Sequence, residues 1–159
     1  MKNAHFIFDY IDDPNGYAEK AQMGVDLTVG KISKIMGGAV IKADPEKPVH
    51  GNTIEVIPYQ QVWELVPGTY SIEFDQGLKP LPNNCSAMII ERSSVGRNGS
   101  WIRSSLYDPG FTTPKMGARL YVEEPISIEL HARVAQITFL DGDESDLYNG
   151  QYQDKKDFR

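Results

Sequence analysis

The sequence predicts an all-β protein, on the basis of its turns, its short strands and its near lack of helical segments. The 159-residue chain has 14 glycines and 10 prolines scattered along it, so turns are frequent. Between the turns lie runs of alternating apolar and polar residues, each about five residues long, the usual length of a strand. Many short strands joined by Gly/Pro turns are typical of a β-sandwich or a β-barrel.

The alternating runs give the expected strands, and one other segment has helical character. That segment is 16–22, which is short. Alternation indicates a strand because successive side chains point to opposite faces of a sheet. The expected strands are, in chain order, Thr53–Ile57, Thr69–Phe74, Ala87–Glu91, Arg119–Glu123, Ile126–Leu130 and Val134–Leu140.

The chain is expected to form a single domain over residues 1–159. This length suits one domain with a substantial core, and the sequence has no internal repeat, linker or low-complexity block. The last stretch, 141–159, is polar and charged, with Tyr148, Tyr152 and Phe158 embedded in it. We expect a mobile C-terminal tail that a ligand or partner orders.

The composition indicates which classes of partner the protein does not bind and in which cellular compartment it is expected. A net charge of −6 and a pI near 5.0 argue against non-specific binding to nucleic acid or to a membrane surface. Cys85 is the single cysteine, so no internal disulfide can form and a reducing compartment is expected. The sequence shows neither a signal-peptide pattern nor a run that approaches a membrane span. We therefore expect a cytoplasmic protein.

The block RSSVGR at 92–97 is a dense source of hydrogen-bond donors. Two guanidinium groups and two hydroxyls stand within six residues, and these groups bind phosphate oxygens well. An alternative is that Arg92 pairs with a structural carboxylate, for which Asp26 is a candidate. The block predicts a phosphate-binding site or the framework of one.

The block YDPGF at 107–111 sets one carboxylate at a tight turn. Pro109 fixes the backbone φ angle and Gly110 frees it, which holds Asp108 at the turn. Phosphate donors and one fixed carboxylate are what attack by water on a polyphosphate requires. The alternative is a surface hairpin with a charged rim, where Asp108 accepts hydrogen bonds from the turn.

The sequence offers no metal site of its own. His5, His50 and His131 are scattered and Cys85 has no partner cysteine, so zinc-type ligand spacing is absent and zinc-dependent cytidine deaminases are excluded. Walker-type and dinucleotide-binding glycine loops are absent too. The expected cofactor is Mg²⁺, held mainly by substrate phosphates and water.

Six motifs stand in order over roughly residues 24 to 153. They are Gly24-Val25-Asp26-Leu27, Pro67-Gly68-Thr69-Tyr70 with Leu81-Pro82, Arg92-Ser93-Ser94-Val95-Gly96-Arg97-Asn98-Gly99, Asp108-Pro109-Gly110-Phe111, Pro125-Ile126 with Arg133-Val134-Ala135-Gln136, and Tyr148-Asn149-Gly150-Gln151-Tyr152-Gln153. Together they resemble the motifs of the superfamily of dCTP deaminases and trimeric dUTPases. The resemblance implies a distorted β-barrel with few short helices, and a homotrimer whose active sites lie between subunits.

The same resemblance assigns roles to single residues. Asp108 matches the water-activating Asp, and Phe111 matches an aromatic that lies against the deoxyribose and would exclude a 2′-hydroxyl. Phe111 has the alternative of an ordinary core aromatic, and Gln136 that of a strand cap. Asp108 is thus the predicted catalytic residue, and the predicted substrate-binding residues are Arg92, Ser93, Ser94, Arg97, Ser104, Phe111, Gln136 and Tyr148.

Departures from the family pattern decide between its two reactions. Deaminases carry a Glu ten residues after the Asp, and Ala118 stands there, whether one counts from Asp108 or back from Pro125. Deamination needs a general base that Ala cannot supply, whereas hydrolysis at the α-phosphate does not need that Glu. The segment 98–107, which in the family forms the base-recognising hairpin, is also about two residues shorter than in deaminases.

The tail departs from the deaminase pattern as well. Gln151 stands where a Lys is usual, and Lys155, Lys156 and Arg159 are candidates to compensate. The sequence therefore predicts a trimeric deoxynucleoside triphosphate diphosphatase that converts dUTP and water to dUMP and pyrophosphate. Two alternatives stay open: a dCTP deaminase with a rearranged acid, and a non-catalytic nucleotide-binding or regulatory trimer.

Overall fold

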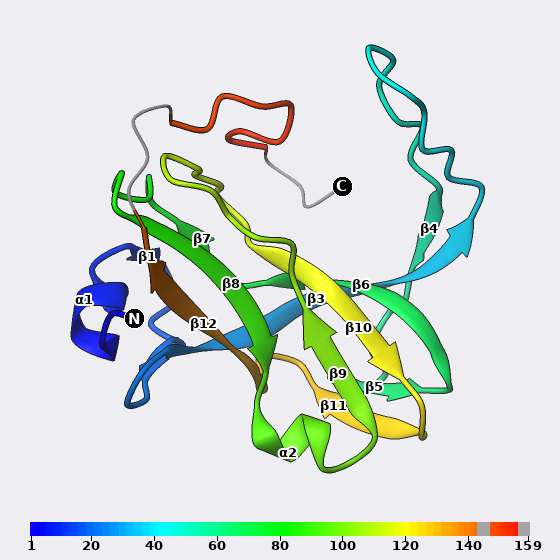
Figure 1. The fold of residues 1–159 in the computed structure, drawn as a ribbon. Helices are drawn as coiled ribbons and strands as arrows, with labels where there is room; N and C mark the ends of the chain where they lie inside the picture. The colour runs from blue at the N-terminus through cyan, green and yellow to red at the C-terminus, as the bar shows by residue number, and fades with distance from the viewer. Residues whose placement is uncertain (143–146, 156–159) are drawn as a thin grey trace.

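Six antiparallel strands close into a barrel in the computed structural model, which describes residues 1–142 and 147–155. Around the ring the order is β3, β12, β8, β9, β10 and β6, and β6 pairs with β3 again (Figure 1). The elements are α1 Ala4–Phe8, β1 Ile11–Asp12, β2 Glu19–Lys20, β3 Val25–Gly37, β4 Asn52–Glu55, β5 Val62–Leu65, β6 Gly68–Phe74, β7 Gly77–Leu78, β8 Cys85–Glu91, α2 Ser93–Gly96, β9 Ser100–Arg103, β10 Gly117–Val122, β11 Ile126–Glu129 and β12 Arg133–Asp141.

Strand β3 closes the barrel because it pairs with two different strands. Its first residues pair with β12, and from Val29 onward it pairs with β6, with a register irregularity between Val29 and Lys31. Gly30 stands at this point, where a Cβ atom would lie 2.6 Å from Oδ1 of Asp75. Glycine therefore lets the strand pass Asp75 closely while it changes partners.

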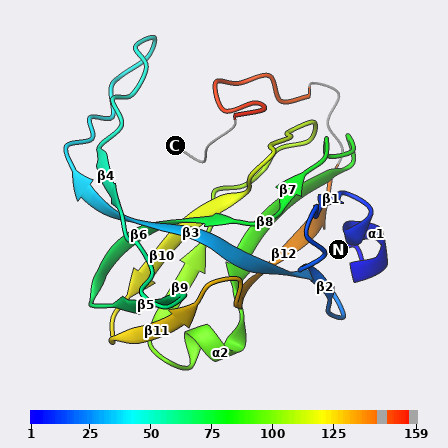
Figure 2. The same ribbon diagram turned by 180° about the vertical axis from the view of Figure 1, so that it is seen from behind.

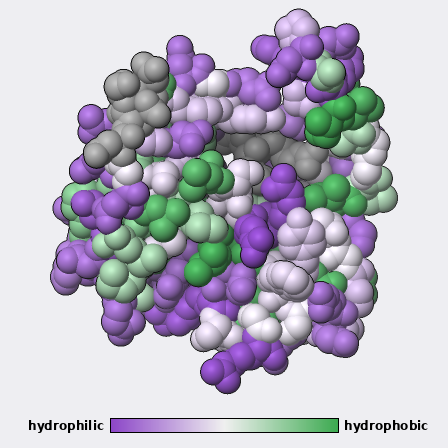
Figure 3. Space-filling view, in the orientation of Figure 1, coloured by the Kyte–Doolittle hydropathy of each residue, from purple (hydrophilic) through white to green (hydrophobic). Residues whose placement is uncertain are grey.

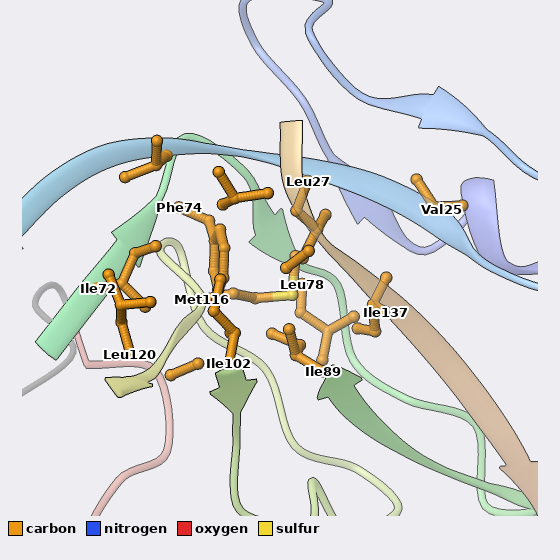
Figure 4. Packing of buried hydrophobic residues seen from close by; sticks show 14 of the residues in the cluster. Val25, Leu27, Ile72, Phe74, Leu78, Ile89, Ile102, Met116, Leu120 and Ile137 are labelled. Carbon is orange, nitrogen blue, oxygen red and sulfur yellow. The ribbon is translucent and has the colours of Figure 1, made fainter. Parts of the chain in front are cut away.

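Alternation along the barrel strands fills the interior with apolar side chains. On β10, for example, Ala118, Leu120 and Val122 are buried while Arg119 and Tyr121 are exposed. Figure 4 shows side chains from several strands packed together in the centre. Among the largest buried residues are Leu27, Ile72, Phe74, Ile89, Ile102, Met116, Leu120 and Ile137.

The expected all-β barrel is confirmed, and each of the predicted strands is present within about two residues of its predicted bounds, as β4, β6, β8, β10, β11 and β12. The predicted helix at 16–22 is wrong. The Asp13 carboxylate accepts hydrogen bonds from the backbone N–H groups of Tyr17 and Ala18, which forms a turn, and β2 follows.

Two parts of the chain leave the barrel. Helix α1 packs beside β12, where Phe6 makes an edge-to-face contact with Phe139. Between β3 and β4 the chain forms an arm that projects from the body, as Figures 1 and 2 show from opposite sides. Within the described residues α1 and α2 are the helices, and neither has the length that crossing a bilayer would require.

Candidate active site

A cavity of about 390 Å³ lies against the outer face of the barrel sheet, beside β6 and β10. Its walls come from β3, β6, β10, the segment that joins β9 to β10, the arm, and residues 147–155 near the C-terminus. Asp108, Phe111 and Tyr148 line it together. The fold thus places one predicted catalytic residue and two predicted substrate-binding residues on one cavity.

Asp108 stands at the cavity on a turn that leaves its carboxylate exposed. The backbone N–H of Phe111 donates to the carbonyl of Asp108 at 3.0 Å, and Gly110 has a φ of 83°, which favours glycine. Within the part of the chain that the structure describes, the Asp108 carboxylate has no hydrogen bond or ion pair. Its oxygens are therefore available to a ligand or to water.

Three aromatic rings form an apolar wall beside Asp108. Tyr107 and Phe111 stack with centroids 4.8 Å apart, and Tyr148 meets Phe111 edge-on at 5.4 Å. The Tyr107 hydroxyl is buried and donates to the carbonyl of Gly117 at 2.9 Å, and burial raises the pKa of this phenol well above its usual value. Phe111 is almost fully buried, so it belongs to the core and to the cavity wall at once.

The segment 147–155 closes one side of the cavity. The N–H of Tyr148 donates to the carbonyl of Pro109 at 2.8 Å, and the N–H of Asp154 donates to that of Thr112 at 3.0 Å. The side chain of Gln153 bonds to both Thr112 and Gly110. This part of the predicted tail is thus held to the turn that carries Asp108, whereas Lys156 and Arg159 lie outside the described residues.

The cavity has more cationic than anionic side chains. Lys115, Arg119 and Lys155 line it, and among the described lining residues Asp108 is the single carboxylate. Sequence reasoning missed Lys115 and Arg119. Arg119 could have been found from the alternation of β10, since it is the exposed residue between two buried ones, but only the fold shows that this face borders the cavity.

The Arg-Ser-Ser block lies at the end of the barrel away from Asp108. Ser93–Gly96 form the short helix α2, and Ser94 and Arg97 line a separate pocket beside β11 and β12. In Figure 1, α2 and the segment between β9 and β10 lie at opposite ends of the molecule. A single chain therefore does not bring Ser93, Ser94 or Arg97 to Asp108.

Arg92 and Gln136 both bind the buried carboxylate of Asp26. The Arg92 Nε lies 3.1 Å from Oδ2 of Asp26, and the Gln136 amide donates to Oδ1 at 2.9 Å. Arg133 is 3.7 Å from the same carboxylate. Pairing of Arg92 with Asp26, which the sequence left as an alternative, is therefore present, and these contacts fix α2 against β3 and β12.

Ser104 and Ala118 both face the protein interior. The Ser104 hydroxyl accepts from the N–H of Ile89 at 2.8 Å and donates to the carbonyl of Ser105 at 2.6 Å, so its donor is already used. Ala118 is fully buried in the core, while its neighbours Gly117 and Arg119 line the cavity. The residue at 118 therefore points away from the cavity.

A resident metal centre has no ligands in the part of the chain that the structure describes. No group of three or more His, Cys, Asp or Glu side chains there could hold an ion. A lone exposed carboxylate beside cations suits an ion that arrives with phosphates, because Mg²⁺ is commonly bound through one or two carboxylates plus substrate oxygens. Asp108 is the residue that could supply such a ligand.

The chain thus forms a closed β-barrel whose cavity is lined by a carboxylate, an aromatic wall and cations. The model of the dCTP deaminase-like family matches residues 7–142. The chain therefore belongs to the dCTP deaminase-like family. This membership confirms the resemblance that the six motifs indicated.

Relatives in archaea have similar sequences over most of their length. The deoxyuridine 5′-triphosphate nucleotidohydrolase of Methanocaldococcus jannaschii is 34% identical over 135 residues, which cover 83% of this chain and 85% of that protein. A probable deoxyuridine 5′-triphosphate nucleotidohydrolase of Aeropyrum pernix is 30% identical over 87% of this chain and 86% of its own.

Solved structures share the fold at much lower identity. A 2′-deoxycytidine 5′-triphosphate deaminase from Agrobacterium tumefaciens aligns with a TM-score of 0.62 at 19% identity, over 87% of this chain and 46% of that one. A dUTPase of Staphylococcus bacteriophage 80alpha aligns with a TM-score of 0.52 at 12% identity, over 91% and 97%. Both support the barrel fold.

Proposed function

We propose that this protein is a dUTP diphosphatase, which converts dUTP and water to dUMP and pyrophosphate. The observation that carries the proposal is the free carboxylate of Asp108 on a cavity lined by stacked aromatics and cations. The archaeal relatives named deoxyuridine 5′-triphosphate nucleotidohydrolases support the same reaction. The substrate class is a deoxynucleoside triphosphate.

Asp108 is the general base of the proposed reaction. Its carboxylate orients a water molecule and accepts a proton from it as the water oxygen attacks the α-phosphorus. The bond between the α-phosphorus and the bridging oxygen breaks, and pyrophosphate leaves. Mg²⁺ held by the substrate phosphates and water would neutralise part of the phosphate charge. Phe111 is the residue proposed to lie against the deoxyribose, where a 2′-hydroxyl buried against the ring would pay a desolvation cost.

The proposed active enzyme is a homotrimer in which two chains share each site. Ser94 and Arg97 are exposed at the far end of the barrel from Asp108, so a second copy has to supply these phosphate donors. Guanidinium and hydroxyl groups then bind the oxygens of the phosphates. Arg92 acts through its ion pair with Asp26, which positions α2.

Deamination of dCTP is not favoured by this cavity. The acid that deamination requires has no counterpart at Ala118, whose side chain is in the core, and Asp108 is the one carboxylate among the described lining residues. In deamination, Asp108 alone would have to activate the water and also transfer a proton to the leaving amine. Hydrolysis needs only one general base, which Asp108 can supply.

One assay tests the proposal against both alternatives. The protein is incubated with each deoxynucleoside triphosphate and Mg²⁺, and pyrophosphate and ammonia are measured separately. The expected result is pyrophosphate from dUTP and no ammonia from dCTP. Stoichiometric ammonia from dCTP would establish deamination instead, and neither product from any substrate would contradict both reactions and favour the non-catalytic alternative.

A further inference from the structure

Two arginines stand side by side on the outer face of the barrel, next to the cavity. Arg103 on β9 is directly opposite Arg119 on β10 in the antiparallel register. Both side chains are exposed and so lie on the same face of the sheet. Residues opposite each other on neighbouring strands have Cβ atoms roughly 5 Å apart, and like charges in these positions destabilise the sheet.

No carboxylate in the described structure neutralises this pair. Neither guanidinium group has an ion pair or a hydrogen bond to any residue in 1–142 or 147–155. The two arginines belong to a cross-strand row, that is, a line of residues directly opposite one another on neighbouring strands. The next residues in this row are Ser71 on β6, opposite Arg119, and Ile90 on β8, opposite Arg103. On β6, Glu73 stands opposite Gly117, two residues along the strand from Ser71. Two cations of an acidic protein are therefore adjacent and uncompensated.

The row continues into the cavity. Arg119 and Ser71 both line it, and Lys115 and Lys155 are on its walls as well. Arg103 extends the row outward along the sheet surface, where apolar side chains such as Trp101 and Tyr121 are exposed. Figure 3 shows this face, on which hydrophilic residues (purple) lie among hydrophobic ones (green).

We infer that Arg103 and Arg119 form a binding site for a phosphoryl dianion at the outer edge of the cavity. Each guanidinium presents a planar fork of N–H donors that fits two oxygens of a phosphoryl group. A dianion between them replaces the repulsion of the pair with two attractions. This inference concerns anion binding and does not depend on the proposed hydrolysis.

The anion has two sources that share this chemistry. One is free pyrophosphate, and the other is the phosphate chain of a bound nucleotide. Both carry the charge and the oxygens that two guanidinium groups bind. The experiment below separates them.

The test uses the 159-residue protein and its variant Arg103→Gln, since Arg103 lies outside the cavity wall. Thermal unfolding is followed in buffer without phosphates, then with pyrophosphate, and then with dUTP in the Asp108→Asn background. Without anion, Arg103→Gln should be as stable as the unchanged protein or more stable, because it relieves the repulsion. With pyrophosphate, the unchanged protein should gain stability and Arg103→Gln should bind pyrophosphate about tenfold more weakly.

Two control variants distinguish a specific site from general charge. Lys47→Gln removes one exposed positive charge on the arm and should leave pyrophosphate binding unchanged. Arg103→Lys keeps the positive charge but loses the planar fork of N–H donors. Its affinity for pyrophosphate should therefore lie between that of the unchanged protein and that of Arg103→Gln. Sodium chloride at matched ionic strength corrects for screening.

The outcomes assign the source or overturn the site. If Arg103→Gln weakens binding of pyrophosphate alone, the pair holds the free anion; if it also weakens binding of dUTP, the pair holds the phosphates of the nucleotide. Equal binding by Arg103→Gln and the unchanged protein would overturn the inference. A fall in oligomer mass with no change in pyrophosphate binding would also overturn it, and would assign the pair to a contact between subunits.

Discussion

At the scale of single residues, Asp108 combines exposure with a fixed position. The turn from Tyr107 to Gly110 is held by the hydrogen bond from the Gly110 N–H to the carbonyl of Leu81 at 3.0 Å. The carboxylate projects from this fixed backbone toward the cavity without a partner among the described residues. In the proposed reaction, a base held in this way would need no rearrangement before it accepts a proton.

Replacement of Asp108 by Asn should abolish hydrolysis and leave nucleotide binding nearly intact. The amide keeps the size of the side chain but cannot accept the proton from water. The transition state therefore loses more stabilisation than the bound ground state does. We expect turnover of dUTP to fall at least about 100-fold. Pyrophosphate release gives the rate and calorimetry gives the binding constant.

The matched control is Asp12→Asn, since Asp12 is an exposed aspartate on β1, away from the cavity. This variant should keep the full rate. Near-normal turnover of Asp108→Asn would show that Asp108 serves only the turn.

Tyr107 is expected to stay protonated at high pH. Burial raises its pKa above the usual value near 10, so the folded protein holds this proton more tightly than the unfolded chain does. The resulting stabilisation is fully present below pH 10 and is lost as the pH rises above it. Tyr107→Phe should lack this dependence above pH 10.

Tyr107→Phe should also cost about 1–2 kcal/mol of stability at neutral pH, because the Gly117 carbonyl loses its hydroxyl donor. Urea unfolding at pH 7 and pH 10.5 measures both effects. Identical pH profiles for the two proteins would show that the Tyr107 phenol ionises as freely in the folded state as in the unfolded chain.

At the scale of elements, the ion pair between Arg92 and Asp26 joins α2 to the barrel. We expect Arg92→Gln to lower the free energy of unfolding by about 2 kcal/mol, because it leaves a buried carboxylate with weaker partners. Arg97→Gln should change stability by less than about 0.5 kcal/mol, since Arg97 is exposed and unpaired within the described residues. Chemical denaturation of both variants makes the comparison, and equal stabilities would show that the pair is not structural.

The stability of the barrel should depend on Gly30, where β3 changes its pairing from β12 to β6. In Gly30→Ala the added methyl would lie 2.6 Å from the Asp75 carboxylate, which accepts hydrogen bonds from Thr28 at 2.6 Å and His131 at 2.8 Å. Relief of this overlap should cost about 1–3 kcal/mol of stability. Gly142→Ala is the control, because nothing lies within 4 Å of a Cβ there. Thermal unfolding of both variants tests this, and equal melting temperatures would contradict it.

At the scale of the whole molecule, the separation of α2 from the cavity has a direct consequence for assembly. If each site is shared, Asp108→Asn and Arg97→Gln should each be inactive alone, yet subunits exchanged between them should regain activity. In an equal mixture about a quarter of the sites would pair an intact Asp108 with an intact Arg97. The rate should therefore recover to about a quarter of the unchanged protein's rate.

Light scattering supports this test, with an expected mass of about three times the 17.8 kDa chain. The control mixture combines each variant with itself under the same exchange conditions and should stay inactive. A monomer at working concentration, or no recovery in the mixture, would contradict the shared site.

The sequence by itself determined the fold class and most of the barrel strands. Strands such as β10 and β12 alternate buried and exposed side chains, and alternation is a local property that the order of residues records directly. Strand β3 was missed because its first five residues are all buried, a pattern without alternation. The helix at 16–22 was predicted wrongly because a single side chain, Asp13, forms a turn with the backbone there.

The sequence also predicted Asp108, Phe111 and Tyr148, which line one cavity, because each belongs to a short motif that stands in the family's order. Only the tertiary structure decided what surrounds them. Strand register places Arg119 at the cavity and opposite Arg103, and barrel closure places α2 at the far end from Asp108. These relations depend on which strands pair and in which register, and contacts between residues far apart in the chain leave no local pattern in the sequence.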